Sequence, residues 1–210
     1  MSENSTGARA LLTHPRLYEA FSTIVGGRRA REVFIREHVR PDERSRVLDL
    51  GCGPGELRTH LPAGVTYVGV DISAAYIDRA RERFGASAEL RVGDATSLDD
   101  DLRDFDLVMA VGVLHHLDDE GVLALLRGSA RAMSGGGRLV SVDPAFWPPQ
   151  SAAARAVIKR DRGQHVRETA EYAQLARSVF THVIPSQRTD LLRIPYTHCV
   201  LECRSPLRDP

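Results

Sequence analysis

Five short apolar runs recur through the middle of the chain, and stretches with helical spacing separate them. The runs cover residues 46–50, 66–72, 88–95, 105–111 and 137–143. They are apolar at nearly every position, which is typical of parallel strands that are buried on both faces. Strands that alternate with helices in this way predict an α/β fold with a doubly wound, mostly parallel sheet.

Helical periodicity is clearest between the second and third runs, where Ser73 is a candidate N-cap and Gly85 a stop. Apolar positions three and four residues apart predict helices elsewhere in the chain as well. The predicted helices cover residues 17–24, 28–39, 73–84, 119–133, 151–161 and 169–180.

The end of the chain adds two predicted strands, at 183–188 and 196–203, so that a seven-stranded sheet is expected. No repeat and no low-complexity linker interrupts the chain. We therefore predict a single domain over residues 1–210, which comprises N-terminal helices at 1–40, a core at 46–144, and helices with a strand hairpin at 145–210.

Three glycines follow the first run directly, in the stretch DLGCGPG over residues 49–55. Glycine allows positive φ and lets a ligand approach the backbone closely, so a polar or anionic ligand is expected at this strand end. We also expect a helix after the turn, with its free N–H groups facing the ligand. The dinucleotide fingerprint G-x-G-x-x-G would need a glycine at Glu56. That spacing opposes a nucleotide-binding dehydrogenase, the main rival among enzymes.

Five motifs in a fixed order are more specific than the glycines alone. DLGCGPG is followed by GVDIS, GDATSL, FDLVMAVGVLHHL and GGGRLVSVDP, each at the end of a predicted strand. This set resembles the class I S-adenosylmethionine-dependent methyltransferases. The resemblance implies a Rossmann-like methyltransferase fold with N-terminal helices as a lid. It also implies S-adenosyl-L-methionine as cofactor and S-adenosyl-L-homocysteine as product.

The first motif would hold the methionine part of the cofactor. By the resemblance, Gly51, Cys52 and Gly53 line it through backbone atoms. Asp49 would order the turn or reach the amino group. Tyr18, on the N-terminal helix, would cover the carboxylate or else pack in the core. Cys52 is expected to stay neutral, because a nucleophilic cysteine needs a nearby histidine or another cation.

The ribose and adenine would lie at the ends of the next two strands. Asp71 matches the acid that holds both ribose hydroxyls, with Ile72 against the adenine. Asp94 matches the acid at the adenine amino group, with Ala95 beside it. Taken singly, Asp71 is also a candidate helix cap and Asp94 a turn-forming residue. The backbone expected to meet the methionine ammonium is that of Ala110 and Val111.

Candidate catalytic residues follow the fourth and fifth strands. A neutral histidine is a general base near neutral pH, so His115 and His116 are candidates. The stretch LHHL is frequent in the resembled family whatever the substrate. For His116 we therefore prefer a pocket-closing role over base catalysis. For His115 the two roles are weighed equally. Asp143 would face the substrate, or cap the turn before Pro144.

Composition and charge argue against several other classes of function. The formal net charge is zero and aromatic residues are 6% of the chain, so neither nucleic acid nor an anionic membrane is an expected partner. No apolar run spans a bilayer, no secretory signal opens the chain, and a cytoplasmic protein is expected. No metal site is predicted, since the acidic run 118–120 is typical of a solvated helix start.

The substrate is expected to be a small molecule, because the additions around the core are short. The basic cluster KRDRGQHVR, 159–167, is either a solvated helix end or an anion grip through Arg160, Arg162 or Arg167. We predict methyl transfer to oxygen, nitrogen or carbon, driven mainly by proximity and orientation. Two alternatives stay open, a non-methylating enzyme that uses the same cofactor and a non-catalytic partner subunit. The oligomeric state stays open as well.

Overall fold

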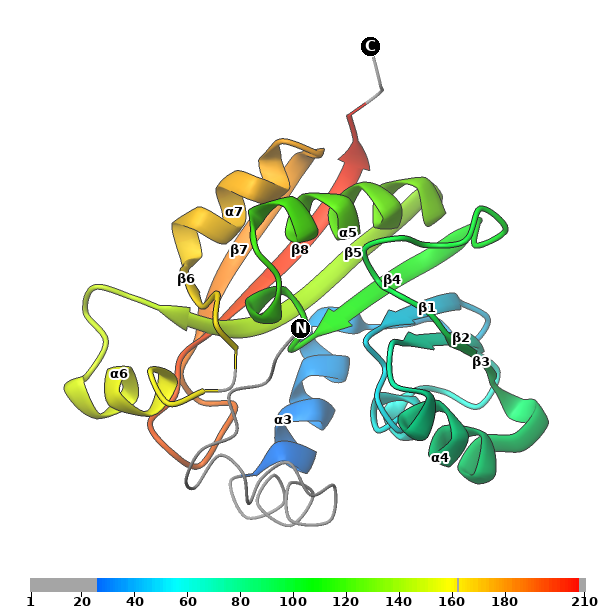
Figure 1. The fold of residues 1–210 in the computed structure, drawn as a ribbon, viewed down its shortest axis with the longest axis horizontal. Coiled ribbons are helices and arrows are strands. Elements are labelled where there is room, and N and C mark those ends of the chain that lie inside the picture. The colour runs from blue at the N-terminus through cyan, green and yellow to red at the C-terminus, as the bar shows by residue number, and fades with distance from the viewer. Residues whose placement is uncertain (1–25, 162, 208–210) are drawn as a thin grey trace.

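The computed structural model describes residues 26–161 and 163–207, and its centre is one twisted sheet (Figure 1). The strand order is β3-β2-β1-β4-β5-β8-β7, and β6 pairs with the far end of β5. Strands β1 to β5 run parallel to one another, whereas β8 is antiparallel to both β5 and β7. The strands are β1 (Arg46–Leu50), β2 (Thr66–Asp71), β3 (Glu89–Val92), β4 (Phe105–Val111), β5 (Met133–Phe146), β6 (Arg167–Glu168), β7 (Phe180–Arg188) and β8 (His198–Pro206).

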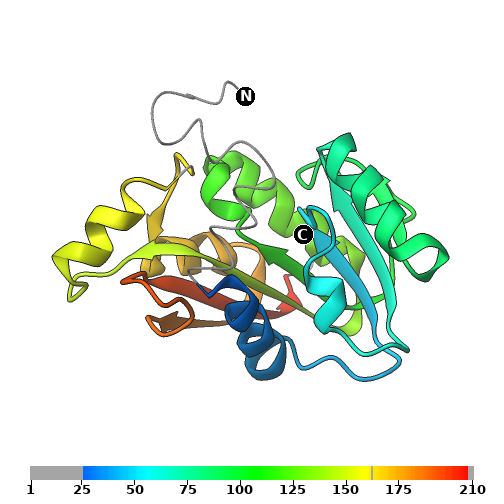
Figure 2. The ribbon, with the colours of Figure 1, turned by 90° about the horizontal axis from the view of Figure 1, so that it is seen from below.

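Helices cover both faces of the sheet, which confirms the doubly wound α/β prediction (Figures 1 and 2). Helices α3 and α4 lie on one face, and α5 and α7 lie on the other. Helix α6 lies beyond the end of β5, at the left of Figure 1. The helices are α3 (Gly27–Phe34), α4 (Ala74–Phe84), α5 (Asp119–Ala132), α6 (Ala152–Ile158) and α7 (Thr169–Arg177).

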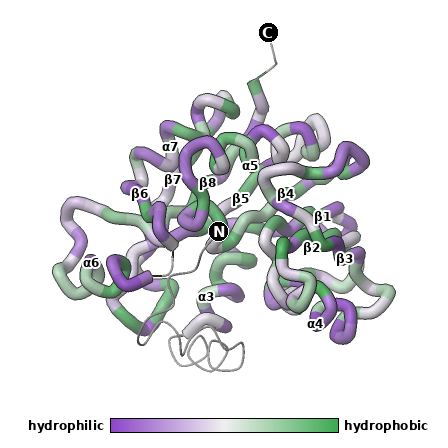
Figure 3. The backbone as a smooth tube through the Cα atoms, in the orientation of Figure 1, coloured by the Kyte–Doolittle hydropathy of each residue, from purple (hydrophilic) through white to green (hydrophobic). Residues whose placement is uncertain are grey.

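Two apolar layers hold these helices to the sheet. Alternate residues of β1 point to opposite layers: Leu48 packs with the α5 and α7 side, and Val47 packs with the α3 and α4 side. Both side chains are fully buried. Apolar positions follow the central strands in Figure 3, and polar ones follow the outer turns of α4. Burial on both faces explains why these strands are apolar throughout.

The segment after the glycine turn corrects one prediction. Instead of an α-helix, a single 3-10 turn, Leu57–His60, follows the glycines. Pro62 accounts for this, because the residue before a proline is driven to extended backbone, and Leu61 has φ −88° and ψ 152°. A ligand at this turn would therefore meet individual backbone N–H groups rather than the end of a long helix.

Other boundaries also differ from the prediction, among them the start of β5, which lies at Met133 and not at 137. β3 ends at Val92 because the Asp94 carboxylate binds the Thr96 N–H at 2.8 Å and turns the chain. β5 continues through Pro144 to Phe146, so Asp143 lies within a strand and does not cap a turn. The helix predicted over 28–39 changes after Phe34 to a π-helical turn, Ile35–Val39. The predicted helix at 17–24 lies outside the described residues.

Candidate functional site

The glycine turn lies where the carboxyl ends of β1, β2 and β4 meet. Gly51, Gly53 and Gly55 have φ of +69°, +55° and +77°, values that only glycine adopts without strain. The N–H groups of Gly51 and Cys52 both donate to the carbonyl of Val70, at 2.8 and 3.1 Å. Hydrogen bonds to β2 thus fix the path of the turn.

The space around these glycines differs. A Cβ atom at Gly51 would lie 2.6 Å from the side chain of Val113, and one at Gly55 would lie 2.5 Å from Phe84. A Cβ atom at Gly53 would meet nothing within 4 Å. Gly51 and Gly55 are therefore required by packing inside the protein. Gly53 instead faces open space that a ligand could fill.

Asp71, predicted to bind a ribose, ends β2 beside this space. Its carboxylate accepts the N–H of Gly53 and the N–H of Ser73, both at 2.8 Å. Ser73 in turn caps α4, as predicted, by accepting the N–H of Tyr76 at 3.4 Å. The Asp71 carboxylate thus joins the glycine turn to the start of α4, and the ligand-binding role stays a prediction.

An exposed apolar surface lies next to Asp71. Ile72 is 66% exposed and Val92, at the end of β3, is 50% exposed, although both are large apolar side chains. Asp94 is exposed and Ala95 half-buried just beyond β3. The carboxylate of Asp94 also accepts the Thr96 hydroxyl, at 2.7 Å. Uncovered apolar side chains with a nearby carboxylate are chemically suited to a flat, aminated ring such as adenine.

Asp49 is a buried carboxyl group with an unsatisfied oxygen. The hydroxyl of Tyr67 donates to its Oδ2 at 2.7 Å. Its Oδ1 is buried and has no hydrogen-bond partner among the described residues. Burial raises the pKa of Asp49 to about 7. A cationic group nearby would lower that pKa and favour the carboxylate, so the residue suits a ligand that carries positive charge.

The other residues predicted around the cofactor line the same strand ends. Cys52 is buried, and burial raises the pKa of its thiol, so the thiol is protonated at neutral pH. Ala110 pairs with Leu50 and its side chain is fully buried, which leaves its backbone as the part that a ligand could meet. Val111 is half-buried. Tyr18 lies outside the described residues.

The two predicted catalytic residues that the structure joins most closely are His115 and Asp143. His115 Nδ1 lies 2.8 Å from Asp143 Oδ1, and Nε2 lies 3.2 Å from Asp161 Oδ1. Burial works against a charge on His115, but the hydrogen bonds to Asp143 and Asp161 outweigh it and raise its pKa to about 9. At neutral pH His115 is therefore an imidazolium that donates from both ring nitrogens.

His116 takes a different position. It is exposed, and the centre of its ring lies 4.1 Å from the centre of the His115 ring. Asp143 is buried, and burial raises its pKa while the hydrogen bonds from His115 work against that rise. The catalytic roles of these residues stay predictions.

Asp161 is a member of this cluster that sequence reasoning missed. Besides the contact with His115, its carboxylate accepts the hydroxyl of Tyr196 at 2.6 Å and the N–H of Gly163 at 2.9 Å. The hydrogen bond from His115 overcomes burial and holds the pKa of Asp161 below its usual range. In the sequence Asp161 lies within the basic cluster 159–167, where only the arginines were candidates.

Arg167, one of the arginines proposed to grip a substrate anion, is turned into the protein. Its guanidinium donates to Asp119 at 2.7 and 2.9 Å, and to the carbonyls of Leu114, Leu117 and His165. Arg160 is exposed and donates to the carbonyl of Ala156, while Arg162 lies outside the described residues. Arg167 thus fastens the segment before α7 to the loop after β4.

Two other kinds of site are absent from the described residues. Within 26–161 and 163–207, no three His, Cys, Asp or Glu residues are grouped so that they could hold a metal ion. No helix in this part of the chain combines the length and apolar character needed to cross a membrane.

Known proteins share both sequence and fold with this chain. A family model described as a methyltransferase domain matches residues 47–137. Trans-aconitate 2-methyltransferase of Mycobacterium tuberculosis is 30% identical over 207 residues, which cover 90% of this chain and 75% of that protein. Phosphoethanolamine N-methyltransferase 1 of Arabidopsis thaliana is 27% identical over 187 residues, 86% of this chain.

A solved structure shares the fold of this chain. The pyocyanin biosynthetic protein PhzM superposes with a TM-score of 0.72 at 19% identity, over 96% of this chain and 63% of that one. Among the sequence relatives, this chain spans only part of the Arabidopsis protein, since the match covers 37% of that protein's length. By its sequence relatives, its strand order and its glycine turn, the chain belongs to the class I S-adenosylmethionine-dependent methyltransferases.

Proposed function

We propose that this protein transfers a methyl group from S-adenosylmethionine to an oxygen, nitrogen or carbon atom of a small molecule. The observation that carries the proposal is the open space at Gly53, bordered by the Asp71 carboxylate. The relatives support it, because each is named as a methyltransferase, although the names differ in substrate. The variety of these names leaves the acceptor of this protein open.

The residues at the strand ends fit the chemistry of this cofactor. The unsatisfied Oδ1 of Asp49 suits a group with positive charge, and the exposed side chain of Ile72 suits a purine ring. Asp71 would accept the ribose hydroxyls beside its two backbone contacts, and Asp94 would face the adenine amino group. When bound, the cofactor supplies a methyl group on a sulfonium, which is already activated for transfer. The protein's part is then mainly to position the acceptor.

The contacts of His115 set a condition for base catalysis. To act as a general base, a histidine must be neutral, with one ring nitrogen free to take a proton. His115 meets that condition after it loses one proton and its Nε2 leaves Asp161, 3.2 Å away. We infer that His115 and Asp143 position the loop after β4 in the charged state. His115 would act as a base only if the bound acceptor displaced the Asp161 carboxylate from His115 Nε2.

The test is transfer of a labelled methyl group. The full chain is incubated with methyl-tritiated S-adenosylmethionine and pooled small-molecule extracts, and label is followed into small molecules other than the cofactor. The proposal expects transfer that Asp71→Ala reduces. Consumption of the donor without methyl transfer would instead favour the non-methylating alternative. Cofactor binding with turnover only in the presence of another protein would favour the partner subunit.

We also infer that the protein acts on free small molecules in a reducing compartment, the cytoplasm. All three cysteines, Cys52, Cys199 and Cys203, are buried free thiols, which is usual where disulfides do not form. The zero formal charge gives no general attraction to nucleic acid. Fractionation of cells that express the chain tests this placement, and recovery outside the cytoplasmic fraction would contradict it.

A further inference from the structure

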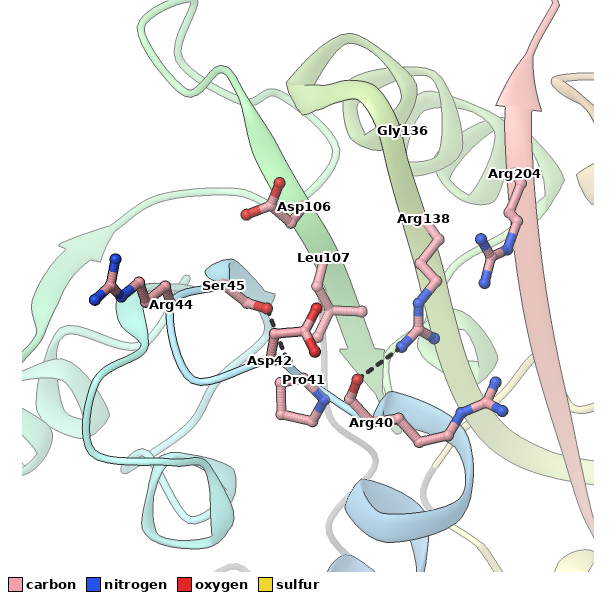
Figure 4. A pocket seen from close by; sticks show the side chains of 10 residues that line it. All are labelled: Arg40, Pro41, Asp42, Arg44, Ser45, Asp106, Leu107, Gly136, Arg138 and Arg204. Carbon is pink, nitrogen blue, oxygen red and sulfur yellow. Dashed lines mark hydrogen bonds between the residues drawn. The ribbon is translucent and has the colours of Figure 1, made fainter.

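A second hollow lies at the opposite end of the sheet from the glycine turn (Figure 4). It has a volume of about 610 Å³ and is lined by the loop before β1, the first residues of β4, the early part of β5 and the end of β8. β1, β4 and β5 are parallel, so their amino ends lie together here and their carboxyl ends lie at the glycine turn. This cavity, called the basic cavity below, is thus separate from the candidate cofactor site.

Arginine dominates its lining. Four of the ten lining residues are arginines, Arg40, Arg44, Arg138 and Arg204, against two aspartates. Figure 4 shows the guanidinium groups of Arg40, Arg138 and Arg204 on the same side of the cavity. Their concentration on one side makes this wall positive although the chain as a whole carries no net charge.

Arg138 is the fixed member of this group. Its side chain is 12% exposed, and it donates to the main-chain carbonyls of His38, Val39 and Arg40 at the end of the π-helical turn. Burial lowers the pKa of Arg138, and the nearby charges of Arg204 and Arg40 lower it further, against the raising effects of Glu202 and Asp42. The three cations therefore crowd one another, and an anion between them would relieve that repulsion.

Two nearby carboxylates, those of Glu202 and Asp106, already have partners, whereas Asp42 is exposed and lines the cavity. Glu202 lies between His38, at 3.3 Å, and Arg40, at 3.0 Å. Asp106 accepts the backbone N–H of Arg46 at 2.9 Å. Within the described ranges, the guanidinium of Arg204 makes no hydrogen bond or ion pair. Arg204 is therefore the cation of this wall that is most available to a ligand.

We propose that the basic cavity binds phosphate groups of a small anionic ligand, with Arg204, Arg40 and Arg138 as the anion-binding wall. A guanidinium presents its N–H donors as a planar fork that matches two oxygens of a phosphate. The volume falls in the range of roughly 300–1,000 Å³ that is usual for small-molecule sites. A cavity of this size accommodates a phosphorylated or diphosphate-bearing molecule as well as free phosphate, and the probes below distinguish these sources.

Calorimetric titration of the full chain with inorganic phosphate and with pyrophosphate, at constant ionic strength, tests the proposal. We expect both to bind, and Arg204→Gln and Arg40→Gln each to weaken binding about tenfold through a lost charged hydrogen bond. Tighter binding of pyrophosphate would indicate a diphosphate-bearing ligand, and equal binding a single phosphate. Arg138 is left unchanged, because its bonds to three carbonyls support the fold.

The matched control is Arg127→Gln. Arg127 is an exposed arginine on α5, which covers the face of the sheet opposite to α3. The substitution should leave the affinity for both anions unchanged. The proposal would be overturned if neither phosphate nor pyrophosphate bound. An equal loss in Arg127→Gln and Arg204→Gln would overturn it too, because it would show diffuse attraction instead of a site. Binding of S-adenosylmethionine should be the same in all three variants, so this proposal and the proposed function fail independently.

Discussion

The carboxylate of Asp71, at the end of β2, accepts the backbone N–H of Gly53, in the turn after β1, at 2.8 Å. The same carboxylate accepts the N–H of Ser73, where α4 begins. One side chain thus fixes two main-chain segments on either side of the open space at Gly53. A change at Asp71 should therefore act both on the ligand and on the shape of the turn.

Replacing Asp71 should weaken cofactor binding strongly. Asp71→Ala removes the acceptor for two backbone N–H groups and the predicted ribose contacts. A charged hydrogen bond is worth roughly 1.5–3 kcal/mol, so we expect the dissociation constant for S-adenosylmethionine to rise at least about tenfold. Calorimetry measures this, with Asp78→Ala on the exposed side of α4 as control. An unchanged constant in Asp71→Ala would remove the residue from the cofactor site.

Gly53→Ala should separate binding from folding. The added methyl group meets no protein atom within 4 Å, so the main cost to the fold is the left-handed backbone, about 1–2 kcal/mol. The methyl group would occupy space assigned to the cofactor, and binding should fall at least about tenfold. Gly135→Ala, in open space and without positive φ, is the control. A Gly53→Ala protein that binds the cofactor normally would show that the open space is not used.

Stability should fall at alkaline pH because of His115. Its pKa is about 9 in the folded protein and 6.5 in the reference state, so its protonation stabilises the fold fully below pH 6.5. This contribution, about 3 kcal/mol, is lost as pH rises through about 9. Urea unfolding between pH 6 and 10, about the range of the titration, measures it.

The comparison needed is with His115→Gln, which should lack the alkaline loss in the free energy of unfolding. His182→Gln, at an exposed position on β7, should keep it. Parallel curves for the wild-type protein and His115→Gln would contradict the ion-paired state described for His115.

Arg167 should matter for stability rather than for substrate affinity. Arg167→Gln would leave the carbonyl of Leu117 and the side chain of Asp119 without the Arg167 donor, whereas the carbonyl of Leu114 would keep the N–H of Leu117 at 3.1 Å. Because the Leu117 carbonyl is buried but the Asp119 side chain is 71% exposed, we expect a loss of about 1–3 kcal/mol in the free energy of unfolding. Arg160→Gln, at the exposed end of the same cluster, should change it by less than about 0.5 kcal/mol. Equal effects of the two substitutions would disprove the structural role of Arg167.

The central strands could be predicted from sequence because burial on both faces leaves an uninterrupted apolar run. Val47 and Leu48 point into opposite layers, and both must be apolar. Ser73 was predictable as a cap because its side chain accepts a hydrogen bond from a residue that is close in the sequence. The local pattern could not show where a strand ends when the backbone of a strand far along the chain continues the ladder. Pro144 stays in β5 because it pairs with His198 of β8.

The predicted site residues were found by motif, and the surprises come from contacts between distant segments. Asp161 reaches His115 only because the loop after α6 folds back over the loop after β4, and Gly163 lies against the His115 ring there. Nothing near Asp161 in the sequence indicates that partner. The basic cavity is of the same kind, because Arg40, Arg138 and Arg204 come from three separated parts of the chain.

The most direct test of this account is calorimetric titration of the purified chain with S-adenosylmethionine and, separately, with NAD. The glycine spacing, the Asp71 carboxylate and the open space at Gly53 predict binding of S-adenosylmethionine and no heat of binding with NAD. Binding of NAD alone would contradict the assignment of the glycine turn to a sulfonium cofactor.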